Sequence, residues 1–483
     1  MSLEWNDVVL KDVLSEKGYI RGPFGSALKR AEMKSEGIPV YEQQNAIYDN
    51  RIFRYYINEE KYQSLKRFTT YTDDLIISCS GTVGKVSIIK HDDPKGIISQ
   101  ALLTLRVNKD LILPEFLKYF FSSYEGYNSL VSRATGSVQV NISKRAVIEE
   151  IPLKLPPLDV QRKIVHYLSL IDKKIETNEK INKNLEQLIK YIYINWFEEF
   201  EPFKDKDFYD TKLGSIPVGW DVKPLQEFIK FQEGPGIRNW QYVEEDGINF
   251  LNIRCIQNND LVLDTANMIS KEEANGKYAH FMLNEWDLVI SSSGTLGRYA
   301  IVREEHLPLC LNTSIIRFTP MHSFDHYAYV YSYLTSRGFY HYLLTMGSGS
   351  VQLNFGPTHL KQIDLIVPPE NILKKYNDLI FPLIEQMVTI KSEISKLTKL
   401  RDTLLPKLMS GEIDVSKINC DLKIIIRKIY IKSSKLFLWR YLSENKNYIK
   451  NTKSNETLLK SRTIYKINKF LAKFNARYRY YRQ

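Results

Sequence analysis

Two stretches of the chain carry hydrophobic residues in alternating steps of four and three, which is the spacing of a coiled-coil seam. The first runs from 160 to 197, and its seam positions are Ile164, Leu168, Ile171, Ile175, Asn178, Asn182, Leu185 and Ile189. The second runs from 372 to 409, and its seam positions are Tyr376, Ile380, Leu383, Met387, Ile390, Ile394 and Leu397. Because a lone helix cannot bury such a stripe, the pattern predicts two long helices that pack together. The two asparagines favour one register of pairing at some cost in stability.

The rest of the chain contains one large internal repeat. The segment DLIISCSGTVGK at 74–85 returns as DLVISSSGTLGR at 287–298, which is 213 residues later. The segment SVQVN at 137–141 returns at the same offset as SVQLN at 350–354. A pair of prolines precedes each predicted long helix. The sequence therefore predicts a duplicated unit, in which each copy is a globular part followed by a long helix.

Each globular part has the pattern of an α+β domain. Short apolar runs between glycine-rich turns predict strands at 75–78, 85–90, 102–107, 288–291, 299–302 and 314–318. Helical stretches are expected at 114–123 and 327–342. The expected organisation is a first domain at 1–156, a helix at 157–200, a linker at 201–217, a second domain at 218–367, a helix at 368–411 and an extension at 412–483.

The order of these segments constrains their geometry. The first long helix carries the chain from one globular domain to the other, and the second helix starts at the second domain. If the two seams pack together, the helices are antiparallel. The two domains then lie at opposite ends of the helix pair, related by an approximate two-fold axis. The start of the chain is expected near the end of the second helix.

Charge and composition exclude some classes of protein. The net charge is +11, but 416–483 alone holds 18 basic and 3 acidic residues, so the main body is close to neutral. No apolar run reaches the ~18 residues of a membrane span, and the N-terminus lacks a signal pattern, so we expect a cytoplasmic protein. The four cysteines are isolated, which predicts reduced thiols and no zinc site.

Several motifs, taken together and in order, resemble one known family. They are GPFGSALK at 22–29, the paired SxSGTxG and SVQxN segments, LPPL at 155–158 leading into Gln161, LGSIPVGW at 213–220 and LLPKLMSGEI at 404–413. The chain is similar, from about 3 to 415, to the specificity subunit of type I restriction–modification systems. The resemblance implies two similar α/β target recognition domains separated by two long spacer helices that form an antiparallel coiled coil.

The resemblance also implies a function and partners. Each recognition domain would read one half-site of a bipartite, asymmetric sequence in double-stranded DNA. The helix pair would set the gap between the half-sites and dock two methyltransferase subunits, and motor–nuclease subunits would complete the complex. S-adenosylmethionine, ATP and Mg²⁺ would belong to those partners, and this chain would hold no cofactor and no metal. No membrane partner is expected.

The paired SxSGTxG segments are the first candidates for DNA contact. Their donors are Ser80, Thr82 and Lys85 in the first domain and Ser293, Thr295 and Arg298 in the second. Hydroxyl and cationic groups on a loop suit a DNA phosphate. The alternative is a tight turn between two strands with no ligand. A nucleotide-binding P-loop does not fit, because neither the required earlier glycine nor a hydroxyl residue after Lys85 is present.

The paired SVQxN segments supply Ser137, Gln139, Asn141, Ser350, Gln352 and Asn354. Gln and Asn can bind adenine, but the alternative is a loop whose asparagine caps a following helix at 142–145. Recurrence in two domains that should read different bases favours a structural role or a phosphate contact. More variable loops are better candidates for base reading: Lys29, Arg30, Gln43, Gln44, Asn45, Arg238, Trp240, Asn252 and Arg254. The alternative for each of these is a solvated loop residue. Ser26, in the GPFGSALK segment, is a further candidate for DNA contact.

Motifs for catalysis are missing from the sequence. Neither H-E-x-x-H nor G-x-S-x-G occurs. Asp49, Glu59 and Lys61 superficially fit a nuclease pattern, which leaves a self-contained nuclease as the alternative function and a coiled-coil scaffold as a third. The basic extension could bind the DNA backbone, lie on an anionic membrane or be incidental. We predict a non-catalytic subunit.

Overall fold

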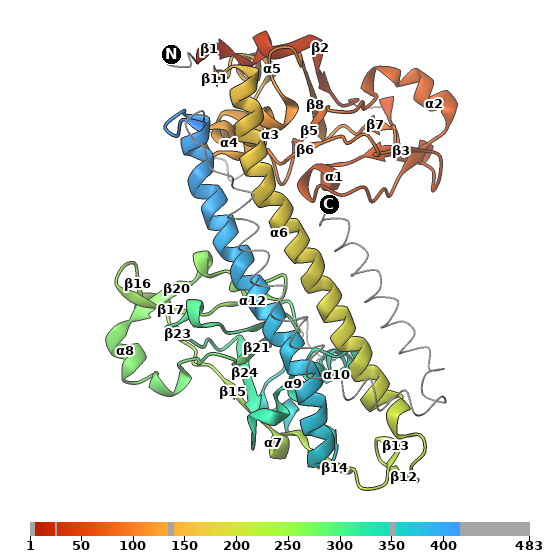
Figure 1. Ribbon diagram of the computed structural model, residues 1–483, viewed down its shortest axis with the longest axis vertical. Coiled ribbons are helices and arrows are strands. Elements are labelled where there is room, and N and C mark those ends of the chain that lie inside the picture. The colour runs from red at the N-terminus through yellow and green to blue at the C-terminus, as the bar shows by residue number, and fades with distance from the viewer. Residues whose placement is uncertain (1–4, 25–26, 134–139, 347–353, 416–483) are drawn as a thin grey trace. The chain divides into compact units, whose positions relative to one another are not determined.

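The computed structural model describes residues 5–24, 27–133, 140–346 and 354–415 (Figure 1). The chain divides into two units, Met1–Ser416 and Lys417–Gln483. Residues 416–483 of the predicted extension lie outside the described residues. The first unit holds both long helices and both globular domains.

Two long helices dominate the first unit. α6 spans Leu158–Tyr193 and continues as a π-helical turn over Ile194–Glu198, and α12 spans Glu370–Met409. Pro157 and Pro369 are their N-cap residues, where a missing N–H leaves no intrahelical hydrogen bond unmade. Figure 1 shows the two helices packed along each other.

Contacts between α6 and α12 establish their relative direction. Arg401 Nη1 lies 3.3 Å from Asp172 Oδ1. Toward the other end, the ring centroids of Trp196 and Tyr376 are 5.5 Å apart. Residue numbers therefore rise along one helix as they fall along the other. The predicted antiparallel pairing is confirmed.

The predicted seam is buried along most of the helix pair. The buried seam residues are Ile164, Leu168, Ile171, Ile175, Asn178, Asn182 and Ile189 on α6, and Tyr376, Ile380, Leu383, Met387 and Ile390 on α12. Leu185, Ile394 and Leu397 are half-buried. Each fully buried aliphatic side chain contributes about 1.5–3 kcal/mol of transfer free energy. Asn178 Nδ2 donates to Glu393 Oε2 at 2.8 Å, so this polar seam position has a partner on the facing helix.

The first globular domain is built on a four-stranded antiparallel sheet of order β2-β8-β5-β6. Its strands are β2 (Leu14–Arg21), β8 (Leu102–Val107), β5 (Leu75–Ser78) and β6 (Val86–Ile88). A second sheet contains β4 (Tyr56–Ile57), β3 (Ile38–Tyr41) and β7 (Ile97–Ile98), with β3 and β7 parallel. The other elements are β1 (Asn6–Val9) paired with β11 (Pro152–Leu155), β9 (Val131–Arg133) paired with β10 (Val140–Ile142), and α1 (Gln43–Ile47), α2 (Glu59–Ser64), α3 (Pro114–Ser122), α4 (Tyr124–Leu130) and α5 (Arg145–Glu149).

The second globular domain repeats this arrangement. Its four-stranded sheet has the order β15-β24-β21-β22, with β15 (Ile229–Glu233), β24 (Ile315–Pro320), β21 (Leu288–Ser291) and β22 (Tyr299–Ile301). Its other sheet contains β16 (Tyr242–Val243), β20 (Asn267–Ser270), β17 (Gly247–Phe250) and β23 (Leu309–Cys310), with β17 and β23 parallel. The other elements are β14 (Asp221–Pro224) paired with β25 (Asp364–Val367), β18 (Ile256–Gln257) paired with β19 (Asp260–Leu261), and α7 (Leu225–Phe228), α8 (Lys271–Asn275), α9 (Tyr327–Leu334), α10 (Arg337–Met346) and α11 (Pro357–Leu360). The duplication read from the sequence is therefore a duplication of fold.

Each domain is attached to one end of the helix pair. In the first domain, the buried Gln161 amide accepts from Leu113 N at 2.9 Å and donates to Pro156 O at 2.8 Å, which fixes the start of α6. In the second domain, the Phe197 ring packs on Trp220 at 5.8 Å. A Cβ placed on Gly411 would lie 3.1 Å from the Trp5 ring, so the start of the chain lies near the end of α12 as predicted.

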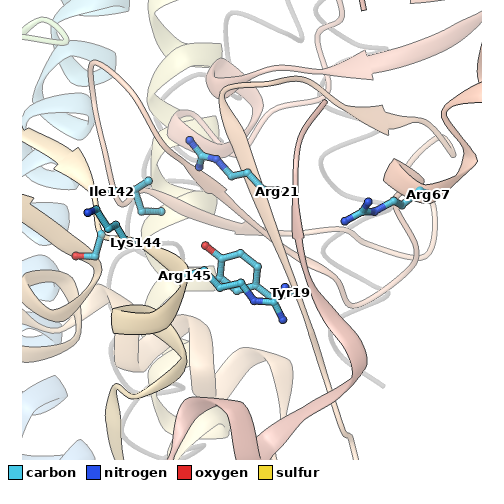
Figure 2. Close-up of a pocket in the computed structure, with 7 residues that line it drawn as sticks. Tyr19, Arg21, Arg67, Ile142, Lys144 and Arg145 are labelled. Carbon is cyan, nitrogen blue, oxygen red and sulfur yellow. The ribbon is translucent and has the colours of Figure 1, made fainter. Parts of the chain in front are cut away.

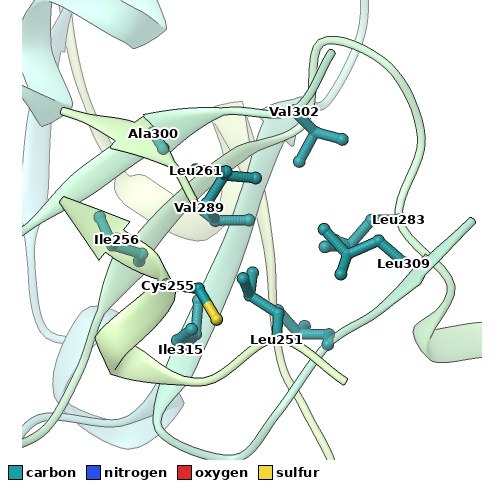
Figure 3. Close-up of a cluster of buried hydrophobic side chains, with 11 residues drawn as sticks. Leu251, Cys255, Ile256, Leu261, Leu283, Val289, Ala300, Val302, Leu309 and Ile315 are labelled. Atoms are coloured by element: carbon teal, nitrogen blue, oxygen red, sulfur yellow. The ribbon is translucent and has the colours of Figure 1, made fainter. Parts of the chain in front are cut away.

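The core of each domain lies against its four-stranded sheet. Figure 3 shows one such cluster in the second domain, where Val289, Ala300 and Ile315 from the sheet meet Leu251 and Cys255 from the segment after β17. All five side chains are buried. Because these residues come from three strands and a distant loop, the cluster ties the sheet to the segment that follows β17.

Two segments differ from the sequence interpretation. The stretch 201–217, read as a linker, contains a hairpin of β12 (Phe208–Thr211) and β13 (Gly214–Pro217). The helix expected at 327–342 is two helices, α9 and α10, because Ser336 starts a new helix by accepting from Phe339 N at 3.1 Å. Ser123 starts α4 in the same way, accepting from Gly126 N at 3.1 Å.

Candidate nucleic-acid interface

The SxSGTxG segments form one turn, repeated in both domains. The buried Ser78 hydroxyl donates to Thr82 O at 2.6 Å and accepts from Lys85 N at 3.0 Å. In the second domain Ser291 donates to Thr295 O at 2.6 Å and accepts from the backbone of the following arginine at 3.0 Å. The first serine of each motif therefore closes the turn on itself and does not face a ligand.

The glycines of the motif are required by the backbone. Gly81 and Gly294 both have φ +66°, in the left-handed region that favours glycine. A Cβ on Gly84 would come within 2.8 Å of the Tyr127 ring, and one on Gly297 within 2.7 Å of the equivalent Tyr340 ring. The tight-turn interpretation thus accounts for the repeated serine and glycines.

The hydroxyl and cationic residues at the outer side of the turns are at least partly exposed. Ser80, Thr82 and Lys85 are exposed in the first domain, and Thr295 and Arg298 are exposed in the second, where Ser293 is half-buried. The turn is thereby a rigid platform that presents hydroxyl and cationic groups. These are donors of the kind that position a protein on DNA phosphates. Their contact with DNA stays a prediction.

The start of α1 reaches the same turn. Gln43 Oε1 accepts from Ser80 N at 2.8 Å and from Cys79 N at 3.2 Å. In the second domain Ile253 occupies the equivalent place beside the turn. A Cβ placed on Gly294, the glycine of that turn, would lie 3.4 Å from Ile253 Cδ1. The two domains therefore differ in chemistry at a position that is structurally the same.

Two further predicted residues fall on equivalent turns. Lys29 N donates to Glu32 Oε2 at 2.9 Å, and Arg238 N donates to Gln241 Oε1 at 3.0 Å, at the start of matching 3₁₀ turns. Both cations are exposed. Trp240 on the second turn is 80% exposed, which leaves its ring available for stacking. The sequence alone gives no link between these two loops, whereas the structure shows that they are equivalent turns in the two domains.

Arg30 lies on the 3₁₀ turn of the first domain, and Gln44 lies on α1. Arg30 is exposed, with its guanidinium 5.9 Å from the Tyr55 ring centroid. Gln44 is half-buried and donates to Ile52 O at 3.0 Å. Arg30 is thus presented to solvent, whereas the Gln44 amide already supports the loop.

Two of the predicted polar residues serve the fold. Asn45 is fully buried, accepting from Glu42 N at 2.7 Å and donating to Ile52 O at 3.1 Å. It holds its loop and cannot reach DNA from that place, so its prediction as a base reader is corrected. Asn252 accepts from Arg254 N at 2.9 Å and donates to Thr265 O at 3.0 Å, while Arg254 itself is exposed.

The SVQxN segments lie largely outside the described residues, as do Ser26, Ser137, Gln139, Ser350 and Gln352. Asn141 lies on β10, and the N-cap of the following helix is Lys144, so the helix-cap interpretation of Asn141 is wrong. Asn354 is exposed. The next residue, Phe355, donates its N–H to Ser292 O at 3.0 Å, so the end of this segment lies beside the turn.

The structure adds a basic hollow that the sequence interpretation missed. Its volume is about 390 Å³, and it is lined by Tyr19, Arg21, Arg67, Ile142, Ser143, Lys144 and Arg145. Figure 2 shows Arg145 alongside Tyr19 and the Arg21 side chain extending toward the segment that carries Ile142 and Lys144. The signal in the sequence is the Lys144-Arg145 pair, which falls in the predicted helix at 142–145.

The hollow adjoins the SxSGTxG turn of the first domain. The Arg21 guanidinium interacts with the Cys79 thiol, which immediately precedes Ser80. Burial raises the pKa of Cys79 to about 11, and the Arg21 charge opposes that rise. The thiol is therefore neutral near pH 7. The turn, Gln43 and the basic hollow together make one candidate interface at the end of the sheet.

Residues of the nuclease alternative do not assemble. Asp49 lies beside Lys118, at 3.7 Å, whereas Lys61 pairs with Glu32 at 2.9 Å and Glu59 accepts from Gln63 at 2.5 Å. Among the described residues, no group of three or more His, Cys, Asp or Glu side chains could hold a metal ion. No helix in the described part of the chain is long and apolar enough to cross a membrane.

Comparison with known proteins agrees with this arrangement. The family model described as "Type I restriction modification DNA specificity domain" matches residues 3–187 and 217–399, one match for each copy of the duplicated unit. The chain is 30% identical over 332 residues to the MjaIX specificity subunit of Methanocaldococcus jannaschii, covering 65% of this chain and 72% of that protein. It is 21% identical over 392 residues to the HindI specificity subunit of Haemophilus influenzae, covering 68% and 84%.

A solved structure has the same fold. The crystal structure of a type I restriction–modification S subunit from M. genitalium matches with a TM-score of 0.50 and 16% identity, covering 84% of this chain and 96% of that chain. The relatives are named specificity subunits, so the nuclease alternative has no support. The chain therefore belongs to the specificity subunits of type I restriction–modification systems, the non-catalytic components that recognise DNA sequence.

Proposed function

We propose that the chain reads a bipartite, asymmetric DNA site, with one half-site for each globular domain, and that the helix pair sets the gap between the half-sites. One observation carries this proposal. The same fold occurs twice on opposite ends of an antiparallel helix pair, yet equivalent positions on and beside the candidate interface differ. Gln43 corresponds to Ile253 at the turn, and Ala31 corresponds to Trp240 on the 3₁₀ turn.

The length of the helices supports a spacer role. At ~1.5 Å per residue, α6 extends about 54 Å over its 36 residues. One turn of B-DNA covers ~34–36 Å, which is the separation of half-sites read by a two-fold protein. A rigid pair longer than one turn can hold two reading domains over separate half-sites on the same duplex.

The chemistry belongs to partners in this proposal. Two methyltransferase subunits dock on the specificity subunit and use S-adenosylmethionine, and motor–nuclease subunits use ATP and Mg²⁺ to complete the restriction complex. The family assignment supports the existence of such a complex.

The test is methylation mapping in cells with and without the gene. The expected result is a split site with adenine methylation that disappears with the gene. Replacing residues 5–156 with the first domain of another family member should change one half-site and leave the other half-site and the gap unchanged. A continuous, unsplit motif, or methylation that persists without the gene, would refute the proposal.

A further inference from the structure

The basic hollow of the first domain concentrates positive charge that the protein does not neutralise. Four cationic side chains line it: Arg21, Arg67, Lys144 and Arg145. Arg145 pairs with Glu149 at 2.7 Å. The other three have no ion-pair partner among the described residues. The hollow therefore carries a net positive charge of about three at neutral pH.

Arg21 stands out among the four cations. Its Nη1 is buried and has no hydrogen-bond partner in the described part of the chain. A buried donor without a partner destabilises the protein, and a charged donor does so more than a neutral one. The guanidinium is held in place by β2 and by its interaction with Cys79. A guanidinium that has an unpartnered Nη1 and lies beside further cations is suited to an oxyanion ligand.

At the equivalent place in the described part of the second domain, three of these cations are replaced. Gly22 directly follows β2, and Gly234 directly follows β15, the equivalent strand of the second domain. Gly22 lies against the backbone of Ser99, and Gly234 lies against the backbone of the equivalent Asn312. The residue before each glycine is therefore equivalent, and Arg21 corresponds to Glu233. Lys144 and Gly356 are the N-caps of the matching helices α5 and α11, and Pro357 replaces Arg145.

The correspondence is also visible in the contacts. A Cβ on Gly356 would lie 3.9 Å from Glu233 Oε2, just as Lys144 and Arg21 line one hollow in the first domain. Burial raises the pKa of Glu233. A carboxyl group thus replaces the central guanidinium, which makes this place in the second domain less favourable for an anion.

We propose that the hollow binds one phosphate of the DNA backbone, and that this contact exists in the first domain alone. The two domains then hold DNA unequally: the first is an electrostatic anchor, and the second lacks this contribution. This proposal rests on the proposed function in one respect, namely that the ligand is DNA. A phosphate contact carries no sequence information, so its loss should weaken binding equally on every DNA sequence.

The test is the salt dependence of DNA binding by the full chain, measured by fluorescence anisotropy on two unrelated duplexes. Each phosphate neutralised contributes about −0.9 to the slope of log K against log salt. Arg21→Gln should flatten the slope by about 0.9 and weaken binding about 10- to 100-fold on both duplexes. Arg21→Lys should keep the wild-type slope, because it retains the charge.

The double variant sharpens the test. If Arg21 and Lys144 share one phosphate, combining Arg21→Gln with Lys144→Gln should flatten the slope by no more than about 0.9 in total. Lys154→Gln, which removes an exposed charge on the separate β1–β11 pair, is the matched control and should leave the slope unchanged. Because Lys144 is exposed, its single variant carries the test even if Arg21→Gln fails to fold.

Two results would overturn the proposal. One is an unchanged slope in a folded Arg21→Gln or Lys144→Gln variant. The other is a loss of affinity confined to one duplex, which would make Arg21 a base reader. Both are measured on generic DNA, so they are independent of whether the protein reads a bipartite site. A chain with no sequence preference could still show the predicted slope change.

Discussion

Lengthening both long helices by one heptad should widen the gap in the DNA site and leave both half-sites as they are. The insertion point is set by the contacts of the two domains. The first domain holds α6 through Asp172, which accepts from Tyr119 Oη at 2.6 Å. The second holds the helix pair through Asn259, whose side chain lies 3.4 Å from Glu186 Oε1 and whose carbonyl accepts from Lys391.

The insertion must therefore lie between these attachments. We place a second copy of residues 173–179 after 179, and a second copy of 393–399 before 393. The pair between Asn178 and Glu393 then stays intact on the side of the first domain, and the inserted copy repeats it. Seven residues preserve the phase of the seam, whereas three or four would locally overwind or unwind it.

The magnitude follows from helix and DNA geometry. Seven residues add about 10 Å at ~1.5 Å per residue. At ~3.4 Å per base pair, this is about three base pairs. Three base pairs also turn the duplex by about 100°, since one helical turn takes ~10–10.5 base pairs. We therefore expect a gap wider by three base pairs together with weaker binding.

The assay is methylation mapping in cells that express the variant with its partner subunits. A heptad added to α6 alone is the control, and it should abolish the activity because the two seams lose their register. An unchanged gap in the doubly lengthened protein would refute the reasoning, as would an altered half-site with the original gap.

Three further predictions concern stability and surface chemistry. Leu168→Ala removes a fully buried seam residue and should lower the free energy of unfolding by about 2–5 kcal/mol, measured by urea unfolding. Burial and the neighbouring Arg303 charge lower the pKa of His306 to about 4, below the ordinary value of 6.5. Because the unfolded state alone takes up a proton in this window, the free energy of unfolding should fall by up to roughly 3 kcal/mol from pH 6.5 to pH 4. His306→Gln should remove that part of the pH dependence; an equally steep profile in this variant would contradict the assignment. Trp240→Ala should leave the unfolding midpoint unchanged, since the ring is 80% exposed, and should weaken binding to the cognate duplex in an anisotropy titration. Unchanged affinity would remove Trp240 from the interface.

Much of the architecture could be read from the sequence because it depends on local periodicity. The strands at 75–78, 102–107 and 288–291 have the predicted bounds. The seam of α6 follows from steps of four and three, which any helix converts into one face. The repeat at an offset of 213 residues predicted the duplicated fold, since similar segments in the same order form the same sheets.

The roles of single polar residues could not be read in the same way. Asn45 and Gln43 are two residues apart and were predicted together, yet Asn45 is fully buried and Gln43 supports the adjacent turn. Asn141 was interpreted as a possible helix cap, but the helix begins later, after Lys144. Each outcome depends on a neighbour far away in sequence, and sequence spacing does not report such neighbours.

The sequence by itself determined the two helices, the duplicated α+β units and their order along the chain. Only the tertiary structure decided which side chains meet at the ends of the sheets. Arg21, Cys79 and Lys144 belong to three separate segments, and sheet order and register bring them together. The same register places Glu233 where the first domain has Arg21. Local periodicity fixes which face of an element is buried, whereas the pairing of distant elements fixes the charge at a shared surface, and this pairing makes the two domains unequal.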